Sequence, residues 1–153
     1  MKLSNNFYLS ELTKSEIASR LDLDNTPSQA VTTNLQFLAE KILQPVRDHY
    51  KVPVIINSGY RSPAVNEATK GSKTSQHMTG EAADFEIPGV DNKDLAKWIK
   101  GNLVFDQLIL EFYKEGDSSS GWVHCSYSPV KKRHSVLTAS IINGKTVYTE
   151  GII

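Results

Sequence analysis

The amino-acid sequence predicts an α+β fold in which N-terminal helices pack on a mostly antiparallel sheet. Helical patterns come early in the chain and strand patterns gather later. The tail also carries Asn143-Gly144 between apolar residues, which is the strongest short signal for a hairpin. At 153 residues, the chain is expected to form one domain spanning residues 1–153.

The first clear element is a long helix that begins near Thr26. Thr26 is the expected N-cap, Pro27 suits the first helical position, and Gln29 would complete a capping box. Apolar residues then recur at spacings of three and four, as in an amphipathic helix: Val31, Leu35, Leu38, Ile42 and Val46. Pro45 is expected to kink or thin this helix near its end.

Shorter elements follow in the middle of the chain. The apolar run 52–57 predicts a strand, and Ser62-Pro63 is expected to cap a brief helix that ends near Gly71. Residues 71–80 are expected to form a loop because of their polar, glycine-containing composition. Residues 82–87 predict a second strand, which ends at Pro88-Gly89.

The second half of the chain predicts one helix followed by strands. Asp91 or Asn92 can cap a helix that carries Leu95, Trp98 and Ile99. Residues 105–113 and 122–127 alternate like strands, and the hairpin at 136–148 completes the sheet.

The composition argues against several classes of protein. Lys and Arg together number 17, as do Asp and Glu, so the formal net charge is zero. Without a clustered positive field we expect no nucleic-acid partner and no attraction to an anionic membrane surface. One cysteine cannot form an internal disulfide, and no apolar run approaches the ~20 residues of a membrane helix.

The start of the chain lacks the apolar segment that follows the basic residue of a signal peptide. We therefore expect a protein that is made in the cytoplasm and is not inserted into a membrane. If its target lies outside the membrane, another component must carry it there.

The four histidines differ in their surroundings. His49 lies in the last turn of the long helix, where a cation favours the negative end of the helix dipole. His134 ends the run Lys131-Lys132-Arg133-His134, which is expected to be a solvated basic loop. His77 lies in a polar loop and His124 lies within an alternating strand pattern, so these two are candidates for chemistry.

His77, Asp84 and His124 form a candidate metal site. Gly80 lets the chain fold back so that His77 approaches Asp84, a strand carboxylate that needs a compensating partner. Strand alternation turns His124 toward one face and Cys125 toward the other. Two imidazoles and one carboxylate suit one zinc ion with a fourth position for water. A His-Asp pair at this spacing is also common without a metal.

Three ordered motifs resemble the zinc peptidoglycan peptidases, which are the D-alanyl-D-alanine carboxypeptidases and the related phage endolysins. The resemblance looks closest to their compact, single-domain members and implies a fold like that of hedgehog domains and DD-peptidases. It extends to residues 7–12, the 25–27 turn and the long helix. The motifs are Ser58-Gly59-Tyr60-Arg61-Ser62-Pro63, Ser75-Gln76-His77-Met78-Thr79-Gly80-Glu81-Ala82-Ala83-Asp84 and Trp122-Val123-His124-Cys125-Ser126.

The resemblance implies that His77, Asp84 and His124 hold one Zn²⁺, whose activated water hydrolyses a peptide bond in the stem peptide of bacterial peptidoglycan. Several relatives place a catalytic glutamate three residues before the last histidine, where this chain has Gly121. Close relatives instead carry a glutamate at the end of the preceding strand, which makes Glu111 the expected general base.

The resemblance also implies that Arg61 and Ser75 bind the substrate. A guanidinium suits this role because it forks around a carboxylate or carbonyl, and a hydroxyl can add a hydrogen bond. Without the resemblance, a structural arginine that bonds loop carbonyls is an equal alternative for Arg61, and Glu111 would be expected to be a sheet-edge glutamate in water. Tyr60 is expected either to support the pocket wall or to pack in the core.

A non-catalytic zinc-containing binding or signalling module of the same fold is the alternative, since hedgehog-type domains resemble this fold. For the enzyme, the pattern fits a D-Ala-D-Ala carboxypeptidase or an endolysin-type endopeptidase, expected to be monomeric. The lack of an export signal favours a phage lysin that reaches the cell wall after release, or an enzyme associated with a virion or its host.

Overall fold

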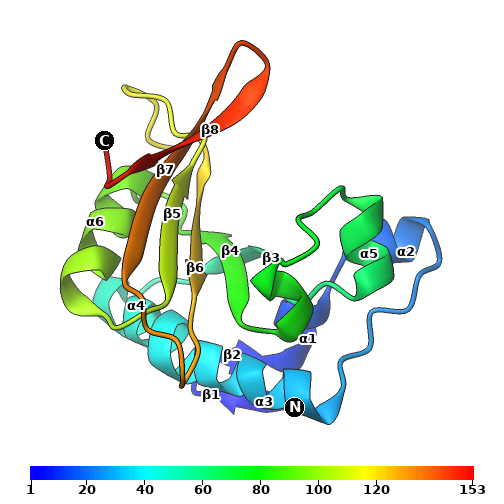
Figure 1. Cartoon of the computed structure of the whole chain (residues 1–153). Helices are drawn as coiled ribbons and strands as arrows, with labels where there is room; N and C mark the ends of the chain where they lie inside the picture. Colours follow the sequence, from blue (N-terminus) through cyan, green and yellow to red (C-terminus); the bar gives the residue numbers. More distant parts are fainter.

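The computed structural model describes residues 1–153 and is built around a six-stranded sheet. Its strands lie in the order β3 (Ile55–Ser58), β4 (Ala82–Glu86), β6 (Trp122–Ser126), β5 (Gln107–Glu111), β7 (Ser135–Ile142) and β8 (Lys145–Glu150) (Figure 1). Every neighbouring pair is antiparallel except β5 and β7, which are parallel. The predicted α+β class with a mostly antiparallel sheet is confirmed.

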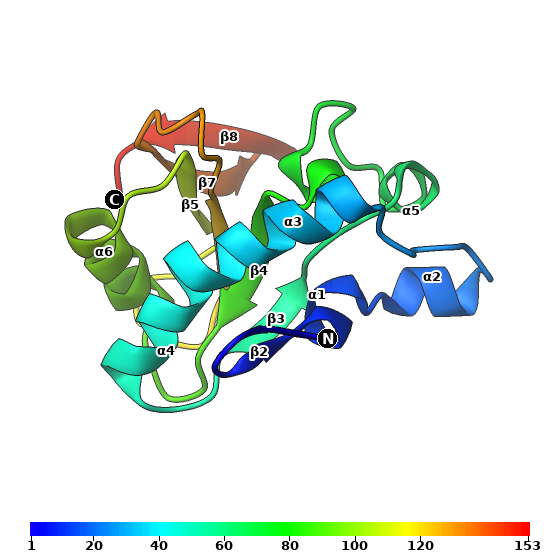
Figure 2. The ribbon, with the colours of Figure 1, turned by 90° about the horizontal axis from the view of Figure 1, so that it is seen from below.

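Helices cover one face of the sheet. A long helical run crosses it, made of α3 (Gln29–Leu38), η1 (Ala39–Leu43) and α4 (Gln44–Tyr50), and α6 (Asn92–Asn102) packs beside it (Figure 2). Burial of apolar side chains between these layers supplies the main stabilising free energy. The buried residues include Leu35, Leu38, Ile42, Val46, Phe85, Leu95, Ile99, Leu108, Val123 and Cys125.

The long helix begins two residues later than the sequence pattern predicts. Ser28 is the N-cap, and its hydroxyl accepts a hydrogen bond of 3.2 Å from the N–H of Val31. Thr26 is therefore not the N-cap, and Pro27 lies outside the helix. The backbone N–H of Thr26 donates instead to the carboxylate of Asp24, a turn that holds this segment out of the helix.

Pro45 is accommodated by a local widening of the helix. The five residues before α4 form the π-helical turn η1, in which the N–H of Gln44 reaches the carbonyl of Ala39. Proline has no N–H, and its ring crowds the carbonyl four residues earlier, here that of Lys41. The wider turn relieves this crowding, so the helical run continues through Tyr50.

The N-terminal segment forms short elements that the spacing of apolar residues in the sequence does not predict. β1 (Lys2–Ser4) and β2 (Phe7–Tyr8) pair as a small separate sheet, followed by α1 (Leu9–Thr13) and α2 (Glu16–Arg20). None of these elements exceeds five residues, which is too short for apolar periodicity to show.

The predicted middle elements are largely confirmed. Ser62 caps α5 (Pro63–Ala68), and Asp91 caps α6 through hydrogen bonds to the N–H groups of Lys93 and Asp94. The segment 71–80 is not entirely loop, because Gln76–Thr79 forms the 3₁₀ turn η2.

The predicted Asn143-Gly144 hairpin is also present between β7 and β8. Both residues have positive φ, 53° and 76°, as a two-residue hairpin turn requires.

The basic run 131–134 is not simply solvated, contrary to the sequence-based expectation. The Arg133 guanidinium forms two hydrogen bonds to the fully buried Asp106 carboxylate, at 2.7 and 3.1 Å. Gln76 also donates to this carboxylate at 2.9 Å. A buried carboxylate needs such donors, and the sequence alone does not reveal that Asp106 is buried.

Two histidines outside the candidate site pack on aromatic rings. His49 stacks on Trp98 with ring centroids 4.3 Å apart, and His134 stacks on Phe105 at 4.1 Å.

None of the helices combines the length and the apolar composition needed to cross a lipid bilayer.

Replacing Asp106 with asparagine should lower the free energy of unfolding by about 1–3 kcal/mol near neutral pH, because charge-assisted hydrogen bonds are lost. Burial opposes the ionised form of Asp106, but Arg133 and Gln76 outweigh burial and lower its pKa. The ionised carboxylate therefore contributes stability above the unfolded pKa near 4 and loses it as pH falls through the lower folded pKa.

Urea denaturation of both proteins between neutral and acidic pH measures this effect. The difference in free energy of unfolding between the two proteins should be largest near neutral pH and should disappear as the pH falls below about 4. An equal gap at every pH would show that the charge of Asp106 plays no part.

Candidate functional site

The sheet register gathers polar residues on the face that the helices leave open. Asp84 pairs with His124 across β4 and β6, His124 pairs with Ile109 on β5, and Glu111 pairs with Trp122. Side chains two apart on a strand share a face, so all five of these side chains lie on the same side of the sheet. The predicted alternation around His124 is therefore confirmed.

His77 reaches this face from η2. The hydroxyl of Ser75 caps the turn by accepting the N–H of His77 at 3.2 Å. Gly80 ends it with φ 77°, and a Cβ there would lie 2.8 Å from the carbonyl oxygen of Val31. The chain then turns directly into β4, as the glycine predicts.

The His77 ring is oriented by a backbone carbonyl. Its Nδ1 lies 2.7 Å from the oxygen of Gly59, so Nδ1–H donates to this carbonyl and Nε2 is left to face Asp84. Gly59 is needed because a Cβ would collide with the carbonyl of Leu12, which also accepts the N–H of Tyr60 at 2.7 Å.

Asn25 holds the same loop in place. Its amide donates to the carbonyls of Thr13 at 2.8 Å and Tyr60 at 3.1 Å, and its side-chain oxygen accepts the N–H of Ser62 at 2.7 Å. The sequence alone predicts no role for Asn25. The only signal that pointed to it is the resemblance, which extends to the 25–27 turn.

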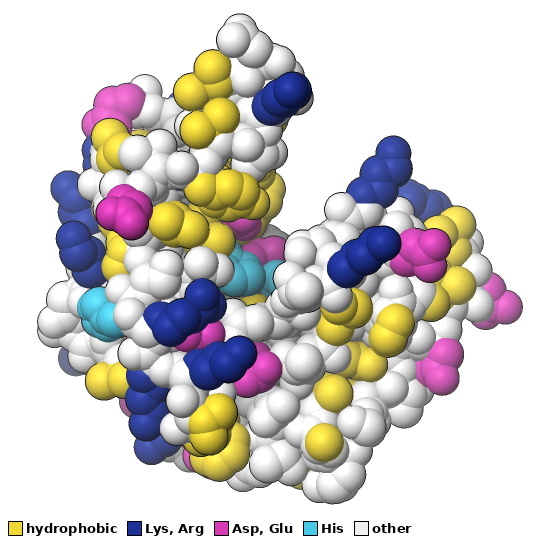
Figure 3. All heavy atoms as spheres, viewed as in Figure 1, with side chains coloured by type: hydrophobic (Ala, Val, Ile, Leu, Met, Phe, Trp, Pro, Cys, Tyr) yellow, Lys and Arg dark blue, Asp and Glu magenta, His cyan; other side chains and the backbone are white.

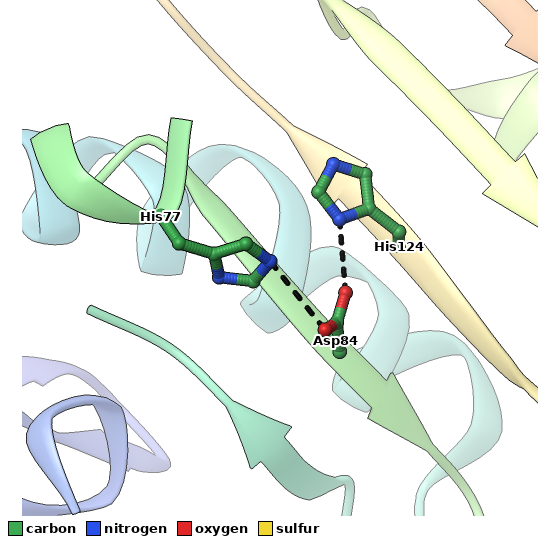
Figure 4. Close-up of side chains that lie close together, drawn as sticks. All are labelled: His77, Asp84 and His124. Carbon is green, nitrogen blue, oxygen red and sulfur yellow. Dashed lines mark hydrogen bonds and ion pairs between the residues drawn. The ribbon is translucent and has the colours of Figure 1, made fainter. Parts of the chain in front are cut away.

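His77, Asp84 and His124 form a compact group of possible metal ligands (Figure 4). His77 Nε2 lies 3.4 Å from Asp84 Oδ2, and His124 Nδ1 lies 2.9 Å from Asp84 Oδ1. Ligand atoms roughly 2.0 Å from a tetrahedral zinc ion lie about 3.3 Å from one another. The spacing, the donor types and the Gly59 carbonyl behind His77 all fit such an ion.

Charge and hydrogen bonding hold Asp84 ionised. Burial disfavours its charged form, but hydrogen bonds and charge interactions with His124 and His77 keep the pKa of Asp84 well below its usual range. Burial likewise disfavours protonated His124, and Asp84 outweighs this effect and raises the pKa of His124. A mostly buried carboxylate that needs positive charge on both sides is suited to a divalent cation.

Glu111 lies beside this group at the end of β5. Burial raises its pKa, and the negative charge of Asp84 adds to the effect, while His124, Trp122 and Arg61 partly offset it. Trp122 Nε1–H donates to its carboxylate. β5 lies between two other strands, so Glu111 is not a glutamate on the edge of the sheet.

Gly121 explains why the glutamate is not three residues before His124. Its φ is 68°, and a Cβ there would collide with the backbone carbonyl of Glu111. A side chain at that position would require the backbone to shift, and the carboxylate at this end of the site comes from Glu111 instead.

Arg61 faces the same site. Its Nη1 donates to the hydroxyl of Thr69 at 3.1 Å, and its buried Nε has no hydrogen-bond partner within the chain. The Arg61 guanidinium therefore forms no hydrogen bond to a loop carbonyl, and only the backbone N–H of Arg61 bonds one, that of His77 at 3.0 Å. Tyr60 is 7% exposed and packs in the core, although it also lines a cavity beside Arg61.

The site lies at the floor of an open cleft. Figure 3 shows histidine side chains between the β7–β8 hairpin on one side and the region of α5 on the other. A cavity of about 1090 Å³ contains Arg61, Ser75, Glu111 and the His77–Asp84–His124 group. The structure thus brings together every residue that the sequence predicts for the site.

An α+β fold with a His-Asp-His group and a partly buried glutamate in one cleft offers the ligands and the carboxylate that a metal-dependent hydrolase requires. A model of the family Peptidase M15 matches residues 5–126, so the chain belongs to the Peptidase M15 family. The match includes all three motifs and confirms the resemblance at the level of this peptidase family. No curated protein matches the chain.

Replacing His77 with alanine should weaken zinc binding by more than about 100-fold, because even residues behind a ligand contribute 10–100-fold. Zinc titration with a competing chromophoric chelator measures the affinity. His49→Ala is the matched control and should bind zinc like the unaltered chain, since His49 stacks on Trp98 outside the site.

Circular dichroism on each variant shows whether the fold is retained. A folded His77→Ala protein with unchanged zinc affinity would exclude His77 as a ligand.

Proposed function

We propose that this protein is a zinc-dependent peptidase that hydrolyses a peptide bond in the stem peptide of bacterial peptidoglycan. The observation that carries this proposal is the convergence of His77, Asp84 and His124 with Glu111 and Arg61 in one cleft. Membership of the Peptidase M15 family supports the class of reaction.

In this proposal His77 Nε2, His124 Nδ1 and a carboxylate oxygen of Asp84 hold the metal. Bound zinc supplies a Lewis acid that activates a water molecule and polarises the carbonyl of the scissile bond. Three protein ligands leave a fourth position for water or substrate, which is typical of a catalytic rather than a structural site.

Glu111 acts as the general base. It accepts a proton from the attacking water and passes that proton to the nitrogen of the leaving amine. Its raised pKa makes Glu111 a stronger base than an exposed glutamate, and the hydrogen bond from Trp122 holds the carboxylate in place.

Arg61 binds an oxygen of the substrate peptide. Its side chain lines both cavities beside the metal-ligand group, and a guanidinium stays charged and can donate to a carbonyl or carboxylate with two N–H groups. Ser75 also lines the cavity, but its hydroxyl already caps η2, so its contribution to substrate binding is secondary.

Space on both sides of the site supports cleavage of an internal bond, as in an endolysin-type endopeptidase. Arg61 and Asp84 line the large cavity on the side of β8, and they also line a second cavity of about 500 Å³ beside α2 and β3. A carboxypeptidase for a terminal D-Ala-D-Ala unit would instead need a pocket that closes behind the last residue.

The zinc-loaded protein should cut purified peptidoglycan fragments, and the new fragments seen by mass spectrometry should disappear when a chelator is added. Their masses identify the bond: an internal cut divides the stem peptide, whereas a carboxypeptidase removes only a terminal alanine. Intact fragments with zinc bound would contradict the proposal and favour a non-catalytic zinc-containing module.

Glu111→Gln should keep zinc and lose at least about 100-fold of the turnover rate, the usual contribution of a general base. Glu86→Gln is the matched control, because Glu86 ends the neighbouring strand β4 and bonds only Asn57. Turnover of Glu111→Gln equal to that of the control would rule out Glu111 as the base.

Arg61→Ala should raise KM for the stem peptide about tenfold or more, as expected when a charged hydrogen bond to the substrate is lost, with zinc content unchanged. Steady-state kinetics and zinc analysis measure the two quantities. Arg20→Ala on the exposed end of α2 is the control. An unchanged KM, or loss of folding, would point to a purely structural role for Arg61.

A further inference from the structure

The β7–β8 hairpin lies beyond the part of the chain that matches the family, which ends at residue 126. In Figures 1 and 3 it rises from the sheet as one wall of the cleft, with apolar side chains gathered on its surface. β7 pairs directly with β5, the strand that carries Glu111, so the hairpin is connected to the site through the sheet. Its contribution to the site is therefore not covered by the family assignment.

The register places Tyr148 in line with the general base. Glu111 pairs with Ala139 on β7, and Ala139 pairs with Tyr148 on β8. Residues opposite one another in a sheet share a face, so the Tyr148 side chain lies on the same side as Glu111. Between them stands only the small side chain of Ala139, which is 1% exposed.

Tyr148 lines the large cavity together with Glu111, Arg61 and the metal-ligand group. Its side chain is 55% exposed in a cleft wall rather than packed in the core. Tyr113, by comparison, donates its hydroxyl to Asp91, whereas the hydroxyl of Tyr148 has no hydrogen-bond partner within the chain. Both the ring and the hydroxyl are thus available to a ligand.

The rest of this cavity is strongly polar. Only three of its lining residues are hydrophobic, and besides Tyr148 these are Ile109, which is 7% exposed, and Val130, which lies out on the rim at 89% exposed. Apart from the imidazoles of His77 and His124, Tyr148 is therefore the only aromatic side chain among the residues that line this cavity. A tyrosine ring can pack on an alkyl side chain while its hydroxyl donates to a peptide carbonyl.

We propose that Tyr148 is a substrate-binding residue, which packs against an alkyl side chain of the stem peptide and donates its hydroxyl to a backbone carbonyl on the Glu111 side of the scissile bond. This inference rests on the proposed function. It assigns part of the selection of the substrate to a hairpin outside the family match.

Three variants test this contact. Tyr148→Ala removes the ring and the hydroxyl, and Tyr148→Phe removes only the hydroxyl. Thr149→Ala is the matched control, because Thr149 is the next residue on β8, is exposed and points to the opposite face.

Two readouts separate binding from turnover. Calorimetry measures the affinity of each variant for a synthetic stem pentapeptide in a zinc-loaded Glu111→Gln background, where the peptide is not cut. Steady-state kinetics on otherwise unaltered protein gives KM and kcat. Tyr148→Ala should weaken binding and raise KM about tenfold, Tyr148→Phe about threefold, and kcat should change less than KM.

Tyr148→Ala values within twofold of those of Thr149→Ala would overturn the inference while leaving the peptidase function intact. An effect on kcat alone would also overturn it, because the contact would then not bind the substrate. If the unaltered protein neither binds nor cuts the peptide, the proposed function fails and this inference fails with it.

Discussion

The site depends on one ionised carboxylate held between two imidazoles on the open face of the sheet. Asp84 loses most of its hydration there, so the fold must surround it with positive or donating groups. The β4–β6 register supplies His124 directly opposite, and the 3₁₀ turn η2 brings His77 to the other carboxylate oxygen. The same demand for positive charge suits this group to a divalent cation.

The residues that position this group act largely through the backbone. The carbonyl of Gly59 orients His77, and Gly59 must be glycine because it presses against α1. Asn25 ties the end of α1 to the loop before α5 through three hydrogen bonds. The short N-terminal elements, which bury Leu3, Phe7 and Leu12 in the main core, therefore also support the candidate site.

Residue type and strand alternation point to His77, Asp84 and His124 as one possible metal site, and the ordered motifs of the family strengthen that prediction. Glu111 follows from the resemblance alone, because its position in the sequence equally fits a glutamate in water at the edge of the sheet. The residue at which the long helix begins and the contacts made by the basic run 131–134 could not be predicted from the sequence. The helix begins where it does because the Asp24 carboxylate accepts the N–H of Thr26 and Ser28 caps the first turn. Arg133 binds Asp106 because that carboxylate is buried. Both depend on three-dimensional contacts that leave no periodic trace in the sequence.

The parallel pairing of β7 with β5 ends at Ala139, and beyond it the two arms of the hairpin pair only with each other. Adding or removing one residue from each arm would preserve the register below the change and leave the catalytic strand untouched. The depth of the cleft can therefore be altered independently of its floor. Changes in the length of the hairpin can therefore alter which peptides fit the cleft, while the residues on its floor keep their positions.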